Sequence, residues 1–443
     1  MTSTSSTAPL SGMRAFTLVW AGQFVSLLGT AMTQFGLTIW AYQLTGQATA
    51  LALVGFFNFA PTIILSPVAG ALVDRWNRKL TMMLSDLGAG AATIAVFLLH
   101  SSGNLQIWHL YAAGAVTGAF QAFQFPAYSA SISLMVRKEQ YGRANGMLAL
   151  AQSASTIIAP PLAGLMLALI GLSGIMLIDI ITFTLAVGAL ALVFIPQPSA
   201  TAEGAEGRGN LLRESIYGFR YIVERPSLLG LQLVFFAINL LASLALAVFA
   251  PMILARTNQQ AEALAFTQAA TGAGGVVGGL LMSAWGGPRP RVHGVLLGMA
   301  ASSLLGMALL GLPSGLWVWM VGAFLMTFFI PLINGSNQAI WQAKVAPDVQ
   351  GRVFAARRMI AQLTIPIAFL AAGPLADQIL EPAMMPGGAL ADAFGGLVGV
   401  GPGAGMGLMF VIMGVLGALV GLGGYLFPAV RDAEKLLPDH VTH

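Results

Sequence analysis

The chain has 443 residues, of which 57% are hydrophobic and 8% are charged, and it contains no cysteine. An average soluble domain carries about 25% charged residues, so this composition excludes a soluble globular protein and indicates an integral membrane protein. The lack of cysteine excludes disulfides, thiolate metal sites and cysteine nucleophiles.

Twelve apolar segments follow one another along the chain, separated by short loops. At a rise of ~1.5 Å per residue, helices of this length can cross a hydrocarbon core of ~30 Å. The first segment is too long, and too lightly charged in front, to be a cleaved signal peptide. The predicted spans cover residues 14–42, 49–73, 80–99, 107–132, 143–170, 173–195, 226–254, 264–286, 292–311, 315–341, 353–380 and 403–428.

The basic residues support this topology because they fall almost entirely on one side of the membrane. If the N-terminus is cytoplasmic, 19 of the 20 Lys and Arg residues lie in cytoplasmic segments, and Arg256 alone lies outside. One span more or fewer would destroy this asymmetry. We therefore expect both termini in the cytoplasm. The net charge of +4 then reflects topology, and nucleic acid is not an expected partner.

A run of Pro, Ser, Ala, Glu and Gly over residues 196–209 divides the chain into two halves. The outer segment 381–402 is rich in Gly, Met and Pro, and either forms a flap over the outward cavity or is a disordered connector. The predicted parts are a cytoplasmic tail (1–13), a six-helix bundle (14–195), a linker with an amphipathic helix from Leu211 to Glu224 (196–225), a second six-helix bundle (226–428) and a cytoplasmic tail (429–443).

The halves are related in sequence by a single offset of 209 residues. One offset that matches at well-separated places argues for a duplication. The matched positions are Gly70 with Gly279, Trp76 with Trp285, Gly142-Arg143 with Gly351-Arg352, and Ala163-Gly164 with Ala372-Gly373.

Four charges lie close together between the second and third spans, in the stretch Gly70-Ala-Leu-Val-Asp74-Arg75-Trp76-Asn77-Arg78-Lys79. This spacing resembles the signature loop of the major facilitator superfamily. The resemblance implies an all-α membrane fold of 12 transmembrane helices in two pseudo-symmetric six-helix bundles, with alternating access by rocking of the halves. Asn77 stands where the family carries a second Gly. Because Asn tolerates a left-handed backbone, we expect the turn to form.

The resemblance also implies a conformational latch on the cytoplasmic side. In this family Asp74 would face the N-terminal end of helix 11, near Arg352. The second copy carries Ser283 and Ala284 in place of Asp74 and Arg75, so the first copy alone retains the latch. Alternatively, the basic residues only anchor the topology. The latch residues are Gly70, Asp74, Arg75, Arg78, Lys79 and Arg352.

Helix 5 carries Ala159-Pro160-Pro161-Leu162-Ala163-Gly164, which resembles the Gly-Pro-x-x-Gly-Gly motif of the superfamily's exporters. The export motif would comprise Pro160, Ala163 and Gly164. Small residues let helices approach closely and Pro160 bends its helix, so packing alone is the competing explanation.

Two predicted helices carry polar residues along one face, and polar groups that face lipid are costly. In the family, helices 1, 4, 7 and 10 line the cavity, which makes these residues candidate substrate contacts. The alternative is hydrogen bonding between helices, worth about 0.6 kcal/mol per bond. The candidates are Gln23, Ser26, Thr30 and Gln34 on helix 1, Thr117, Gln121, Gln124 and Tyr128 on helix 4, Asn239 on helix 7, and Asn334 and Asn337 on helix 10.

Asp179, inside helix 6, and Asp86, in helix 3, are the candidate coupling groups. A carboxyl group in apolar surroundings is easier to protonate near neutral pH, as proton coupling requires. Asp179 has a competing structural role as a partner of Thr182 or Thr184. Helix 1 contains no acid and helix 4 lacks the buried Arg of many related antiporters, so proton coupling is implied by kinship.

The chain contains no Gly-Lys-Ser/Thr, His-Glu-x-x-His or Gly-x-Ser-x-Gly motif, so we expect neither an enzyme nor a metal or cofactor site. Residues 351–358 and 372–377 resemble the macrolide-efflux and enterobactin-export branch of the superfamily's drug:proton antiporters. That branch implies a bacterial plasma-membrane exporter of amphipathic drug-like or natural-product molecules by proton antiport, and we expect it to be a monomer. A dedicated siderophore or peptide-metabolite exporter, a lipid flippase and a non-transporting sensor remain alternatives.

Overall fold

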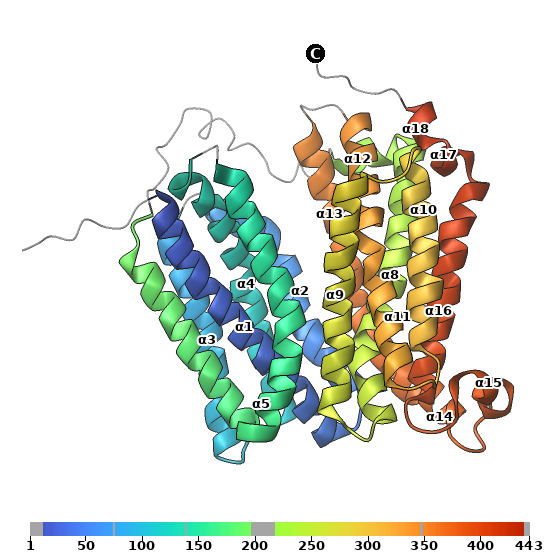
Figure 1. Cartoon of the computed structure of the whole chain (residues 1–443), viewed down its shortest axis with the longest axis horizontal. Coiled ribbons are helices and arrows are strands. Elements are labelled where there is room, and N and C mark those ends of the chain that lie inside the picture. Colours follow the sequence, from blue (N-terminus) through green and yellow to red (C-terminus); the bar gives the residue numbers. More distant parts are fainter. Residues whose placement is uncertain (1–11, 74–75, 138–139, 196–217, 346–348, 438–443) are drawn as a thin grey trace, which may run out of the picture. The chain divides into compact units, whose positions relative to one another are not determined.

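The computed structural model describes residues 12–73, 76–137, 140–195, 218–345 and 349–437 (Figure 1). All regular elements of these residues are helices. The first five are α1 (Gly12–Thr45), α2 (Ala48–Val73), α3 (Arg78–Ser101), α4 (Ile107–Met135) and α5 (Tyr141–Leu192). The others are α8 (Pro226–Arg256), α9 (Ala261–Trp285), α10 (Arg291–Ala301), η2 (Ser302–Ala308), α11 (Leu316–Phe328), α12 (Ile330–Lys344), α13 (Gln350–Pro374), η3 (Leu375–Leu380), α14 (Glu381–Met384), α15 (Ala391–Val398), α16 (Ala404–Gly423), η4 (Gly424–Leu426), α17 (Pro428–Arg431) and α18 (Ala433–Leu436).

The predicted all-α membrane fold is confirmed. Ten segments of the described chain are long and apolar enough to cross a membrane. One of them, Gly146–Leu192, covers two predicted spans. The helix breaks between these spans at Gly171, which adopts a φ of 68°. That left-handed conformation suits glycine. The predicted fourth span corresponds to α4, so each of the twelve predicted spans is helical.

The chain groups into two compact units. Unit 1 comprises residues 1–40 and 57–201, and unit 2 comprises residues 41–56 and 202–443. The end of α1 and the first turns of α2 thus pack with the second half of the chain. Of the predicted amphipathic helix, residues 218–223 are helical, and Tyr221 and Ile222 are buried in the core of unit 2 beside Leu228 and Trp341.

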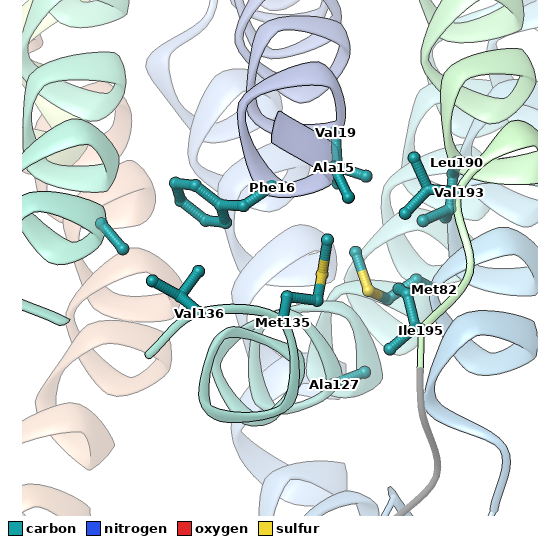
Figure 2. Packing of buried hydrophobic residues seen from close by; sticks show 11 residues of the cluster. Ala15, Phe16, Val19, Met82, Ala127, Met135, Val136, Leu190, Val193 and Ile195 are labelled. Carbon is teal, nitrogen blue, oxygen red and sulfur yellow. The ribbon is translucent and has the colours of Figure 1, made fainter. Parts of the chain in front are cut away.

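In unit 1, α1 lies directly against the second part of α5. A Cβ atom added to Gly29 would lie 2.4 Å from Thr182 Oγ1 and 3.1 Å from Asp179 Cα, so only glycine permits this approach. Near the start of α1, Phe16 joins a cluster of buried side chains that includes Met82, Met135 and Leu190 (Figure 2). These contacts fix the positions of α1, α3 and α4 relative to one another.

Asn77 does not adopt the left-handed conformation that an Asn residue at this place in the loop would tolerate. Its φ is −65° and its ψ is 111°, and its side-chain oxygen accepts a hydrogen bond from the Leu80 amide at 3.1 Å. Asn is a favoured N-cap residue because its side chain satisfies an amide of the first helical turn. The departure from Gly therefore provides a cap for α3.

Two half-buried charged residues, Arg256 and Glu381, hold the segment between α13 and α16 to the rest of unit 2. The Arg256 guanidinium donates to the main-chain oxygens of Gly403, Leu312 and Val398 at 3.1, 2.9 and 2.8 Å. The Glu381 carboxylate accepts from the amides of Gly403 and Met406 at 3.1 and 2.8 Å, which caps α16. The predicted outer segment 381–402 is therefore an ordered part of unit 2.

Replacing Arg256 with alanine is expected to lower the apparent melting temperature of the detergent-solubilised protein by several degrees. Three main-chain oxygens lose a charged donor, and such bonds contribute about 1.5–3 kcal/mol each before the remaining groups relax. The control is Arg431→Ala, because Arg431 is exposed and its side chain bonds the adjacent Asp432. Equal melting temperatures for the two variants would contradict a role for Arg256 in holding this segment.

Candidate functional site

Side chains from three helices of unit 1 meet at the Asp86 carboxylate. Gln23 Nε2, from α1, donates to Asp86 Oδ2 at 2.8 Å, and Gln124 Nε2, from α4, donates to Asp86 Oδ1 at 2.8 Å. Gln124 Nε2 also lies 3.3 Å from Gln23 Oε1. The predicted polar stripes of helices 1 and 4 thus converge on one of the two predicted coupling groups.

In the part of the chain that the structure describes, no basic side chain forms an ion pair with the Asp86 carboxylate, which is hydrogen-bonded to two neutral amides. Gln124 Oε1 and the Tyr128 hydroxyl are buried without hydrogen-bond partners. Asp86 is half-buried. A half-buried carboxylate with two amide donors and no countercharge can bind a cationic or hydrogen-bonding group.

Asp179 is the more enclosed of the two acids, with 2% of its surface exposed. Thr30 Oγ1 donates to its Oδ1 at 2.9 Å, and its Oδ2 is buried without a partner. The hydroxyls of Thr182 and Thr184, the sequence-based alternatives, bond the main-chain oxygens of Asp179 and Ile180 instead. Asp179 therefore holds α1 against α5 through Thr30.

The remaining cavity candidates differ in exposure. Ser26, Thr117 and Asn239 are half-buried, while Gln34, Gln121 and Asn334 are exposed. Asn337 on α12 is 1% exposed, and its side-chain oxygen has no partner. Their role as substrate contacts stays a prediction.

The predicted latch is described in part. Asp74 and Arg75 lie outside the described residues, and of Arg352 the structure describes only its place in α13. Lys79 Nζ donates to the main-chain oxygens of Ala191 and Val193 at 2.7 and 2.8 Å, which ties the start of α3 to the end of α5. On α5, the export-motif residues Pro160, Ala163 and Gly164 are all buried.

Asp377 makes a contact that the sequence did not reveal. Its carboxylate accepts hydrogen bonds from the amides of Ala48 and Thr49 at 3.0 and 2.7 Å and from the Thr49 hydroxyl at 2.6 Å. It thereby caps the first turn of α2, whose amides have no partner within the helix. A Cβ added to Gly373 would lie 2.5 Å from Thr49 Cα, so the two backbones are in close contact.

Within the described residues, no group of three or more His, Asp or Glu side chains is arranged to hold a metal ion. The site can instead bind a cationic or hydrogen-bonding group reversibly at a single carboxylate, mainly that of Asp86.

Comparison with known proteins places these features in a family. The model of the Major Facilitator Superfamily matches residues 19–369. The chain is 28% identical over 368 residues to macrolide efflux protein A of Streptococcus pyogenes, covering 82% of this chain and 90% of the relative. It is 23% identical over 317 residues to the enterobactin exporter EntS of Shigella flexneri, covering 71% and 73%.

A solved structure has the same fold. A bacterial homologue of the human lysosomal transporter Spinster, in an inward-facing and unoccupied conformation, superposes with a TM-score of 0.68. The sequences are 15% identical, and the match covers 95% of this chain and 98% of that one. The predicted resemblance to efflux proteins is also confirmed by the relatives above.

Proposed function

Because the chain belongs to the major facilitator superfamily, we propose that it exports amphipathic drug-like or natural-product molecules across the bacterial plasma membrane in exchange for protons. The similarity to macrolide efflux protein A supports the direction and the substrate class. The observation that carries the proposal is the Asp86 carboxylate, bound by Gln23 and Gln124 from the two helices predicted to line the cavity.

Proton exchange requires a group that holds either a proton or the cargo. Asp86 suits this role because its hydrogen-bond partners are neutral amides, and no basic side chain among the described residues pairs with it to keep it ionised. A bound cationic or hydrogen-bonding substrate would favour the carboxylate and thus release the proton. Asp179, enclosed beside Thr30, is the second candidate.

Alternating access requires contacts that close each end of the transporter in turn. We assign closure of the outer end to Asp377, which binds the first turn of α2. By family resemblance, closure of the cytoplasmic end involves Gly70, Asp74 and Arg352. In this scheme both termini are cytoplasmic and the monomer is the working unit.

The similarity to the enterobactin exporter supports a second candidate, dedicated export of a siderophore. This function would use the same fold and the same cavity, and it differs from the first in substrate breadth. A test of function therefore needs probes of both kinds.

Purified protein in liposomes with an acidic lumen is expected to release lumenal protons when substrate is added outside. Three probes suffice: a macrolide, a catecholate siderophore and a permanently charged lipophilic cation, which cannot carry a proton itself. Protein-free liposomes control for passive effects of weakly basic drugs. Equilibration of labelled probe without any change of lumenal pH would contradict antiport and favour a facilitator or a lipid flippase.

A further inference from the structure

The segment between Glu381 and Gly403 contains α15, an eight-residue helix beside α14 and the first turn of α16 (Figure 1). Its surroundings are fixed. The Leu390 amide donates to Ala383 O at 2.9 Å, and the Gly401 amide donates to Met384 O at 3.0 Å. Arg256 binds the last residue of α15 through Val398 O. The orientation of α15 about its own axis is therefore determined by the fold of unit 2.

The helix has three distinct faces, which follow from helical spacing. Ala391 and Val398, seven residues apart, are buried against unit 2 at 7% and 1% exposure. Ala393 and Leu397, four residues apart, lie on a second, exposed face that Phe394 extends toward the buried one. Asp392 and Gly396 lie on a third face, which is also exposed. The three faces are distinct because each residue of an α-helix is rotated by about 100° about the helix axis from the one before it.

The second face exposes large apolar side chains, whose contact with water is unfavourable. Phe394 is 38% exposed and Leu397 is 45% exposed, and Val400 and Met385 beside the helix are 49% and 39% exposed. Asp392 is the single charged residue of α15 and lies on the other exposed face. The arrangement of one protein-facing, one apolar and one polar face is what a helix needs at the junction of protein, lipid and water.

We propose that α15 lies in the interfacial region of the bilayer, with Phe394 and Leu397 inserted among the lipids and Asp392 facing water. The position supports the bilayer as the occupant. The helix packs at the start of α16, a membrane span that exposes Ile412, Val415 and Leu419 along its length. α15 is therefore attached to the start of a helix whose exposed side chains are apolar, as those of a lipid-facing helix are. The absence of basic residues from α15 implies that insertion does not require anionic lipids.

Spin labelling tests this proposal cleanly, because the chain contains no cysteine and every introduced one is unique. Labels would be placed singly at Leu397→Cys and Phe394→Cys on the apolar face. Asp392→Cys is the water-facing control on the same helix, and Leu419→Cys on α16 is the lipid-facing control. In liposomes of neutral lipid, each label's relaxation would be measured with oxygen, which concentrates in lipid, and with a water-soluble nickel chelate.

Labels at positions 394 and 397 are expected to be more accessible to oxygen than to the nickel chelate, as at 419, with the reverse at 392. Free access of the nickel chelate at 397, equal to that at 392, would overturn the proposal. Shielding from both reagents would also overturn it, because a protein partner or a second copy would then cover the face. Neither result bears on proton exchange, so this test is independent of the proposed transport function.

Discussion

Replacement of Asp86 by asparagine is expected to abolish substrate-driven proton release from liposomes, with a fall of at least about tenfold in the initial rate. Asparagine is close in shape and retains an oxygen that can accept from Gln23 or Gln124, but it cannot take up or release a proton. Efflux of labelled probe down its own gradient is expected to persist. A stopped-flow record of lumenal pH together with probe flux measures both quantities in one sample.

Asp179→Asn is the matched control for that experiment. Asp179 is bound by Thr30 and is almost completely enclosed, so this variant is expected to retain proton release and to lose some thermal stability. Loss of proton release in Asp179→Asn, with normal release in Asp86→Asn, would transfer the coupling role to Asp179. Normal release in both variants would contradict coupling through either acid.

Replacement of Asp377 by alanine is expected to shift the protein toward a conformation that is open at the outer end. The variant loses three hydrogen bonds from the first turn of α2. Bonds to a charged group contribute about 1.5–3 kcal/mol, and ~1.4 kcal/mol already changes a ratio of conformations tenfold. Spin labels at Gln47→Cys and Ala389→Cys would report the change as a second, longer distance in pulsed electron resonance.

Thr49→Val provides the graded control, because it removes one of the three bonds and leaves both main-chain amides paired with Asp377. Its longer component is expected to be smaller than that of Asp377→Ala. Identical distance distributions in the wild type and Asp377→Ala would show that this cap does not hold the outer end closed. The wild type, labelled at the same two positions, gives the reference distribution.

The membrane spans were predictable from the sequence because each is marked by its own hydropathy and length, without reference to the rest of the chain. Gly171 also falls between two predicted spans, where the helix breaks. The turn at Asn77 was expected to form because Asn tolerates a left-handed backbone, but the residue has a φ of −65° and its side chain caps α3 instead. Asn is favoured both as an N-cap and in left-handed turns, so the residue type alone does not distinguish the two conformations.

The candidate site was predictable only in its parts. Helical spacing identifies the polar faces that carry Gln23 and Gln124, but the meeting of both side chains at Asp86 depends on the rotation of three packed helices. The cap on α2 is harder still, because Thr49 and Asp377 are 328 residues apart. No local pattern marks either residue as the other's partner.

The hydrogen bonds from Lys79 to Ala191 and Val193 hold the end of the first half in place without help from the linker that follows. They fasten the last helical turn of the first half to a helix of that same half. Tyr221 and Ile222, at the other side of the linker, are buried in unit 2 and bring the next span to its place. Each half thus holds its own end of the linker, so we expect the two pieces of a gene split within residues 196–217 to assemble when they are expressed together, and their failure to co-purify would contradict this expectation.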